Sequence, residues 1–418
     1  MQFGRLHCLM LTAALVGALG TTAAHAGPLA VIANYTDPGT ATRPPTGWPP
    51  GSVAIIDTAT DKEVGPRLTV GANPGAVAIT PDGTTAVIAC TQDSEIDFID
   101  LTAAPPKVTD KIKVGDGQGD TFYPAGLAMD PKGQFVAVTS NKGGGADTST
   151  QIRYLKIVSL TDHTVNTVDL QNDQLLDENG KPFVGTAEAA AISPKGGLLI
   201  VSPSTGGEIY SLPYADGQIN FPDTAENQMV GVTGHTGFNI ALTPDGTTGI
   251  IPLWLGKVEV ISLDSTGKLV VNTDPSSGNL SIGPLVDTKG TGTHSVAISA
   301  DGKLAYVRNL LPPENITVFQ IGAGPSLTPT GTLNASGFPP LLIAAIPELS
   351  TTGAFVGSPM IAVTPDGKKV YSANPYAGGT GLLDLGDGNV EVFQSTNPAP
   401  IATLQTGKNP IAIAIQPK

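Results

Sequence analysis

The sequence predicts an all-β chain folded as a seven-bladed β-propeller with four-stranded blades, the last blade being closed by N-terminal strands plus a C-terminal strand. Three observations predict this fold. A short apolar segment recurs seven times, each of its first six copies leads into three further predicted strands, and each end of the chain supplies the part of a blade that the other lacks. Because self-similar units of this size indicate a repeat architecture, the 418 residues need not be divided into several domains.

The recurrent segment predicts an inner strand with one small and one bulky face. An alanine stands three residues before the turn proline in every copy, with Ala300 replacing the proline in the fifth copy. The seven alanines are Ala78, Ala128, Ala191, Ala241, Ala297, Ala362 and Ala414. The residue after each alanine is large and apolar, and successive side chains of a strand point to opposite faces. We therefore expect the alanine face of one blade to pack against the bulky face of the next.

The rest of each unit supplies three more strands. Asp-Gly or Lys-Gly ends the segment, as at Asp82-Gly83, where glycine provides the positive φ of a tight hairpin. A second apolar strand follows, then a third that alternates polar and apolar residues, as in 95–101 and 257–263, and a weaker fourth, as in 110–115. Four strands in each such unit are typical of a propeller blade.

The chain ends predict how the ring closes. Residues 410–418 supply only an inner strand, whereas residues 29–70 supply three strands without one. Pairing the two fragments completes the seventh blade and leaves no edge strand open to aggregation. Residues 27–418 are therefore predicted to form a single propeller domain.

The second strand and the turn before it carry a family resemblance. The segments PDGKKVYSAN (365–374), ADGKLAYVRN (300–309) and PDGTTAVIAC (81–90) resemble the YVTN-family β-propeller repeat. The resemblance extends over the mature chain and implies a propeller fold. Such propellers include surface-layer proteins, lactonase-like enzymes, cofactor-bearing dehydrogenase subunits and metal-handling proteins, so the resemblance selects no activity.

Residues 1–26 have the composition of a signal peptide. Arg5 precedes an apolar run over 9–19, and the small-residue motif Ala24-His25-Ala26 stands before Gly27. We expect cleavage after Ala26 and a mature protein in the periplasm, at the cell surface or outside the cell.

Charge and cysteine content restrict the partners. Loss of Arg5 leaves 21 basic and 36 acidic residues, a formal charge of 21 − 36 = −15, which repels nucleic-acid phosphates and anionic lipid. No apolar run after the leader is long enough for a membrane helix. Cys90 is then the single cysteine, so no intrachain disulfide can form, and its strand position predicts a buried, inert thiol. We expect a monomer that binds a protein, a glycan or a small molecule.

The strand order divides the loops between two faces. The Asp-Gly hairpins lie at one face, while the loops that lead into inner strands or join second to third strands lie at the other, which we call the loop-rich face. Long insertions such as 35–51 and 374–389 belong to it, and loops on a rigid scaffold commonly carry recognition. The candidate ligand-binding residues around its channel mouth are His235, His294, Trp254, Arg308, Asn141, Asn374 and Tyr376.

Two groups of residues could bind a divalent metal, calcium or zinc. His235 and His294 lead into the inner strands of neighbouring blades, where they could face each other across the channel rim. Asp384 and Asp387 offer the oxygen ligands that calcium prefers. A structural function, as a loop cap or a polar hairpin turn, is the alternative for both groups. The sequence therefore allows a calcium or zinc ion and predicts no other cofactor.

Three functions are compatible with these residues. The first is a binding or scaffold protein that recognises its ligand or partner on the loop-rich face. The second is a lactonase-like hydrolase in which His294, Glu188 and Arg308 polarise an ester and activate water. The third is a periplasmic metal- or cofactor-binding propeller. The first inner strand lacks the histidines usual in lactonase-like propellers, and the CxxCH, GxSxG, phosphate-loop and HExxH motifs are absent. Binding is therefore the predicted function.

Overall fold

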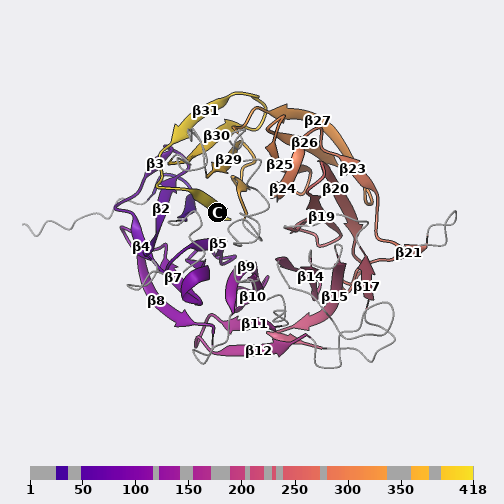
Figure 1. Ribbon diagram of the computed structural model, residues 1–418, viewed down its shortest axis with the longest axis horizontal. Helices are drawn as coiled ribbons and strands as arrows, with labels where there is room; N and C mark the ends of the chain where they lie inside the picture. Colours follow the sequence, from indigo (N-terminus) through magenta and orange to yellow (C-terminus); the bar gives the residue numbers. More distant parts are fainter. Residues whose placement is uncertain are drawn as a thin grey trace, which may run out of the picture.

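Seven antiparallel sheets stand in a ring around a common axis in a computed structural model of the chain (Figure 1). The structure describes residues 25–35, 49–115, 122–141, 154–170, 189–202, 208–220, 228–231, 239–273, 280–336, 359–375 and 387–417. Among these residues the elements are strands and one 3-10 turn, η1 (Thr91–Asp93). None of the described residues forms a helix of the length and apolarity that a bilayer span requires. The predicted seven-bladed propeller is confirmed.

Each blade has four strands, counted outward from the axis, and blades 1 to 6 follow the chain while blade 7 joins its two ends. The inner strands of blades 1 to 7 are β5 (Pro74–Ile79), β9 (Tyr123–Met129), β13 (Ala189–Ile192), β18 (Ala241–Leu242), β24 (Thr291–Ile298), β28 (Ile361–Val363) and β32 (Pro410–Ile415). The second strands are β6 (Thr85–Cys90), β10 (Phe135–Asn141), β14 (Gly197–Ser202), β19 (Thr248–Leu253), β25 (Leu304–Leu311), β29 (Lys369–Asn374) and β1 (Leu29–Asn34).

The outer half of each blade is more variable. The third strands are β7 (Glu95–Asp100), β11 (Tyr154–Ser159), β15 (Glu208–Ala215), β20 (Lys257–Ser262), β26 (Asn315–Ile321), β30 (Asn389–Gln394) and β2 (Gly51–Asp57). The outermost strands are β8 (Lys107–Lys113), β12 (Val165–Asp169), β17 (Gln228–Gly231), β23 (Leu285–Asp287), β27 (Leu327–Leu333), β31 (Pro400–Leu404) and, in blade 7, the short β3 (Lys62–Glu63) and β4 (Leu68–Val70). Short additional strands are β16 (Gln218–Ile219), β21 (Asn272–Thr273) and β22 (Leu280–Ser281).

Blade 7 closes the ring as predicted. Strand β32 pairs antiparallel with β1, from Ala30 opposite Ile415 to Asn34 opposite Pro410. In Figure 1 the indigo N-terminal strands and the yellow C-terminal strands accordingly lie side by side. All residues of β1 are fully buried, because β2 and β32 cover its edges and the neighbouring blades cover its faces.

The alanine faces pack as the repeat predicts. Ala128 of blade 2 shares an apolar cluster with Ile192 of blade 3, and Ala297 of blade 5 shares one with Val363 of blade 6. At four further junctions an alanine of one blade again shares an apolar cluster with a bulky residue of the next blade. These pairs are Ala191 with Leu242, Ala241 with Ile298, Ala362 with Ile415 and Ala414 with Ile79. A small residue on one blade thus leaves room for the isoleucine, leucine or valine of the next, which gives the close packing of a protein interior.

The Asp-Gly turns owe their stability to one repeated set of hydrogen bonds. Thr80 Oγ1 donates to Asp82 Oδ1 at 2.6 Å, and the same oxygen accepts the Thr84 amide at 3.0 Å. These bonds hold the pKa of Asp82 below its ordinary value. Gly83 has φ of 74°, as a tight turn of this type requires. The turns at Asp245, Asp301 and Asp366 use the same contacts.

Candidate functional site

A β-bulge where the chain enters the inner strand gives the loop-rich face its most distinctive residue. In blade 5 the register of β24 on β25 shifts between Thr293 and Ser295, so His294 is the extra residue of the bulge. The same shift makes Gly75 the extra residue in blade 1 and Ile411 in blade 7. Bulges re-aim side chains and are frequent beside functional sites. The register of blade 2 shifts at the corresponding place, between Pro124 and Leu127, and of these four bulges the one in blade 5 carries an ionisable side chain.

His294 is buried at the junction of blades 5 and 6, with 1 % of its surface exposed. Its Nδ1 lies 2.8 Å from Oγ of Ser295. The same oxygen accepts the amide of Met360, the residue before β28, at 3.2 Å. The Ser295 hydroxyl can donate to Nδ1 or accept from it, according to the imidazole tautomer, and in either case the contact orients the ring. The ring therefore has a fixed orientation.

Arg308 on β25 lies in the same junction and is fully buried. Its Nη1 donates to the carbonyl oxygen of Asn309 at 2.7 Å, and its Nη2 donates to Asn374 Oδ1 at 2.8 Å and to the carbonyl oxygen of Ser336. Its Nε has no hydrogen-bond partner among the described residues. Burial lowers the pKa of the guanidinium to about 10, while the nearby Glu391 acts in the opposite direction. Arg308 is therefore a cation at neutral pH.

Of the other candidate ligand-binding residues, the structure describes the side chains of Asn374 and Trp254. Asn374 is buried. Its Oδ1 accepts a hydrogen bond from Arg308, and its Nδ2 donates one to Asn389 Oδ1 at 2.9 Å. Trp254 is half-buried beside Leu255, which is 61 % exposed. Asn141 is the last residue of β10, and the structure does not describe its side chain. The predicted residues His235, Glu188 and Tyr376 fall outside the described residues.

The predicted metal ligands are not brought together by the part of the chain that the structure describes. Asp387 is exposed and lies 3.8 Å from Lys408 Nζ, and Asp384 and His235 fall outside the described residues. Among the described residues no group of three or more histidine, cysteine or acidic side chains has the spacing of a metal site. The calcium or zinc site stays a prediction.

Cys90 ends β6 as a buried thiol, as predicted. Burial raises its pKa well above the ordinary value, and the charges of Asp97 and Glu95 act in the same direction. The thiolate that a nucleophile or metal ligand requires is therefore disfavoured.

The third strands have a recurrent buried polar position that the sequence pattern does not reveal. In each blade a residue near the middle of the second strand pairs with a residue of the third strand. The third-strand residue immediately before that partner is polar or charged in five blades, and each of these five residues is at most 5 % exposed. The five residues are Asp97, Lys156, Glu259, Thr317 and Glu391. Alternation in a strand suggests that the polar face is solvated. In a propeller the neighbouring blade covers that face, so these groups need internal partners.

Four of the five groups have such partners. Asp97 Oδ2 accepts the Gly71 amide at 3.0 Å and lies 2.6 Å from Lys111 Nζ. Lys156 Nζ donates to Thr167 Oγ1 at 2.9 Å, and Glu391 accepts from the amide and the hydroxyl of Ser336. Thr317 donates to the carbonyl oxygen of Thr288. Glu259 differs, because no described residue is a partner of its buried Oε2 and burial raises the pKa of its carboxyl group to about 7.

The substitution Glu259→Gln should therefore stabilise the protein at high pH. A carboxyl group whose pKa is raised in the folded chain binds a proton on folding, so its contribution to the free energy of unfolding falls as pH rises from 4.5 to about 7. We expect Glu259→Gln to be more stable than the wild type by about 3 kcal/mol at pH 8 and by much less at pH 5. Urea unfolding at both pH values measures the difference. The matched control is Glu63→Gln, an exposed residue of β3. An equal stability change at both pH values would contradict the prediction.

Comparisons with known proteins support the architecture. No protein-family model matches the chain, and no curated protein matches it, so the YVTN-family relation remains a resemblance of the repeats. A protein of unknown function from Desulfotomaculum acetoxidans superposes with a TM-score of 0.65 at 17 % identity, covering 93 % of this chain and 98 % of that one. A proposed 6-phosphogluconolactonase from Bacteroides uniformis gives 0.61 at 14 %, covering 93 % and 99 %.

A third solved structure comes from an exported enzyme. The periplasmic gluconolactonase of Pseudomonas aeruginosa superposes with a TM-score of 0.60 at 16 % identity, covering 93 % of this chain and 99 % of that one. Identities this low show a shared fold and leave the activity open. The chain is a seven-bladed β-propeller similar in architecture to gluconolactonase-like propellers.

Proposed function

We propose that the protein is an exported binding propeller that takes a small oxygen-rich ligand, of the sugar-lactone class, on the loop-rich face beside His294. The observation that carries the proposal is the bulge in β24, which makes an imidazole the extra residue where blades 1 and 7 have glycine and isoleucine. Strand pairing alone requires no ionisable residue there.

The charge next to this histidine suits such a ligand. Arg308 carries a buried positive charge on the strand that pairs with β24, opposite Ser295. Electrostatic attraction is stronger in a protein interior than in water, so carbonyl, hydroxyl or carboxylate oxygens are favoured near the junction of blades 5 and 6. The solved propellers named as gluconolactonases provide the chemical class by analogy.

The burial of His294 has a kinetic consequence for this proposal. Because 1 % of the residue is exposed, the ligand must displace the groups that cover the ring before contacting it. Binding that requires a conformational change is slower than the usual protein association rates. We therefore expect slow association.

Replacing the histidine should abolish ligand binding. Glucono-1,5-lactone and gluconate are expected to raise the melting temperature of the wild type and to leave His294→Ala unaffected, because the variant lacks the imidazole that would contact the ligand. Thermal shift and isothermal titration measure the two effects. The matched control is His163→Ala, since His163 lies away from the bulge, stacked on Phe98 and paired with Asp110 at 2.6 Å. Equal ligand responses of wild type and His294→Ala would contradict the proposal.

Hydrolysis of the bound lactone is the second candidate function. It is favoured by the Ser295 contact at Nδ1 of His294, which holds the ring in one orientation, as general acid–base catalysis requires. The measurement is acid release from glucono-1,5-lactone above the spontaneous rate. If the wild type and His294→Ala released acid at the same rate, hydrolysis at this residue would be excluded. The binding proposal would still be decided by the thermal-shift and titration experiments.

A further inference from the structure

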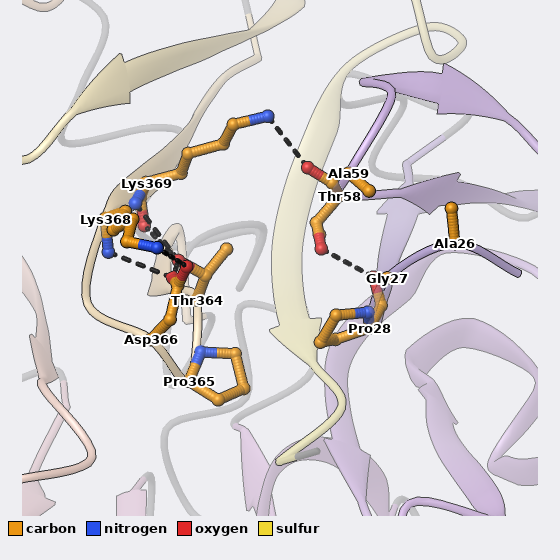
Figure 2. Close-up of a pocket in the computed structure, with 10 residues that line it drawn as sticks. All are labelled: Ala26, Gly27, Pro28, Thr58, Ala59, Thr364, Pro365, Asp366, Lys368 and Lys369. Carbon is orange, nitrogen blue, oxygen red and sulfur yellow. Dashed lines mark hydrogen bonds and ion pairs between the residues drawn. The ribbon is translucent and has the colours of Figure 1, made fainter.

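The Asp-Gly hairpin face has a groove between the first and last parts of the chain (Figure 2). It has a volume of about 480 Å³ and lies between blade 7 and blade 6. Its lining residues are Ala26, Gly27, Pro28, Thr58, Ala59, Thr364, Pro365, Asp366, Lys368 and Lys369. The predicted signal-peptide cleavage site, between Ala26 and Gly27, is thus part of the wall of this groove.

Most charged side chains around the groove are already paired. Lys369 Nζ lies 2.7 Å from Asp61 Oδ2 and donates to the carbonyl oxygen of Thr58 at 2.8 Å, as Figure 2 shows for Thr58. Tyr371 donates its hydroxyl to the other oxygen of Asp61. Lys368 Nζ lies 3.3 Å from Asp366.

Asp57 is the exception among the described charged residues here. It is 7 % exposed and makes no ion pair with another described side chain. Its Oδ1 accepts the amide of Ala59 at 2.8 Å, and its Oδ2 accepts the amide of Ala26 at 3.1 Å. A nearly buried carboxylate without a cation is unfavourable. The donor at Oδ2 belongs to the last residue of the predicted leader.

The chain after the cleavage site is held firmly in place. The carbonyl oxygen of Pro28 accepts both the amide and the hydroxyl of Thr58, at 3.0 and 2.7 Å. The amide of Leu29 donates to Gln416 Oε1 at 2.7 Å. These bonds do not involve the leader, so they persist after its removal and keep Gly27 beside Asp57.

We propose that Asp57 is the binding site for the new N-terminus of the mature protein. The proposal rests on the predicted cleavage after Ala26. Hydrolysis of that peptide bond adds the hydroxyl of water to the Ala26 carbonyl and its hydrogen to the Gly27 nitrogen. At neutral pH the new carboxyl group of Ala26 passes its proton to the amine, which becomes an ammonium group. Departure of Ala26 removes the donor at Asp57 Oδ2 and places this ammonium next to the oxygen. Processing thus exchanges a neutral hydrogen bond for an ion pair.

The fit of Gly27 supports this assignment. A Cβ atom at Gly27 would lie 3.3 Å from Asp57 Oδ1 and 2.9 Å from both Cβ and N of Ala59. The Cα of Gly27 is one bond from that position and is bonded to the amine, so the amine lies in the neighbourhood of the Asp57 carboxylate. The contact with Ala59 also leaves no room for a larger residue, which explains why glycine stands at this position.

The amine itself provides the first test. The exported protein should have the mass of a chain that begins at Gly27, and the pKa of its α-amine should lie above the ordinary range of roughly 7.7–8.0. Because acylating reagents react with the neutral amine, the amine of the folded protein should react several-fold more slowly at pH 7.5 than that of the unfolded protein. Asp57→Asn should restore the ordinary pKa, whereas Asp366→Asn, which changes another carboxylate of the groove, should not.

Stability gives the second readout. A pKa that is raised by folding contributes stability that is fully present below the ordinary pKa and is lost as pH rises through the higher folded value. The melting temperature of the mature protein should therefore fall between about pH 8 and pH 10 relative to that of Asp57→Asn. A chain extended to begin at Thr22 carries its N-terminal charge away from Asp57, so its melting temperature should not fall over this pH range. This extended chain replaces Asp57→Asn in the comparison if that variant does not fold.

The same measurements can overturn the proposal. An N-terminus at another residue, an α-amine of ordinary pKa in the wild type, or an amine pKa that Asp57→Asn leaves unchanged would each do so.

Discussion

Deleting residues 410–418 should leave a chain without cooperative unfolding at ordinary temperatures. The deletion removes β32, the inner strand of blade 7, and uncovers one edge of β1. Ile411 and Ile413 are each 1 % exposed, and burial of such a side chain contributes roughly 1.5–3 kcal/mol. Together with the lost strand pairing and the exposed faces of the adjacent blades, the loss approaches the roughly 5–15 kcal/mol that stabilises a typical domain. Thermal unfolding followed by circular dichroism measures it.

A permuted chain provides the matched control for this deletion. Ile415 pairs with Ala30, and the amide of Gln416 donates to the carbonyl oxygen of Leu29, so a short turn can join the end of β32 to the start of β1. Moving residues 410–417 in front of residue 27 through such a turn gives blade 7 the hairpin that the other blades have. The permuted chain should melt close to the intact protein. Unchanged melting of the truncated chain would show that the composite blade is not needed.

Replacing Arg308 by methionine should cost about 3–5 kcal/mol of stability. Methionine fills much of the arginine volume but donates no hydrogen bond. It therefore leaves four acceptors without their donor: the carbonyl oxygens of Asn309, Asn315 and Ser336, and Oδ1 of Asn374. Arg308→Lys should lose less, because lysine keeps the charge and lacks only the planar fork. Urea unfolding of the wild type, Arg308→Lys and Arg308→Met measures the order of their free energies of unfolding.

The control for Arg308 is an arginine in the opposite environment. Arg67 is 41 % exposed and pairs with Glu63 at 2.7 Å. Exposed pairs of this kind contribute at most about 1 kcal/mol, so Arg67→Met should be nearly neutral. If Arg308→Met were also nearly neutral, the hydrogen bonds between blades 5 and 6 would not stabilise the ring.

The fold could be predicted because its determinants repeat. Each inner strand places an alanine at the same offset from its turn, and the packing of Ala128 with Ile192 shows that the offset encodes contact with the next blade. The composite blade followed from the same argument, since three strands at one end and one at the other make a complete sheet. Local patterns and global topology agree at every blade, which is why the prediction succeeded.

The site could be predicted only in part. His294 and Arg308 are sequence-based candidates whose contribution to a site stays a prediction, and the burial of both could not be predicted, because burial at a junction depends on the neighbouring blade. Asn374 is a predicted ligand-binding residue, and its contacts with Arg308 and Asn389 inside the protein could not be read from the sequence. Glu259 was overlooked because an alternating strand suggests a solvated polar face. Glu188, His235 and Tyr376 lie outside the described residues, and their contribution to a ligand site stays a prediction.

The pairing of β1 with β32 also sets an order of events during synthesis. Ala30 meets Ile415, so β1 must wait for about 380 further residues before its last neighbour exists. At roughly 5–20 residues per second, the ribosome takes about 20–80 s to supply them. During that interval an apolar strand edge is open to pairing with other chains. Crossing a membrane unfolded and closing the ring only after release would spare the protein this exposed intermediate.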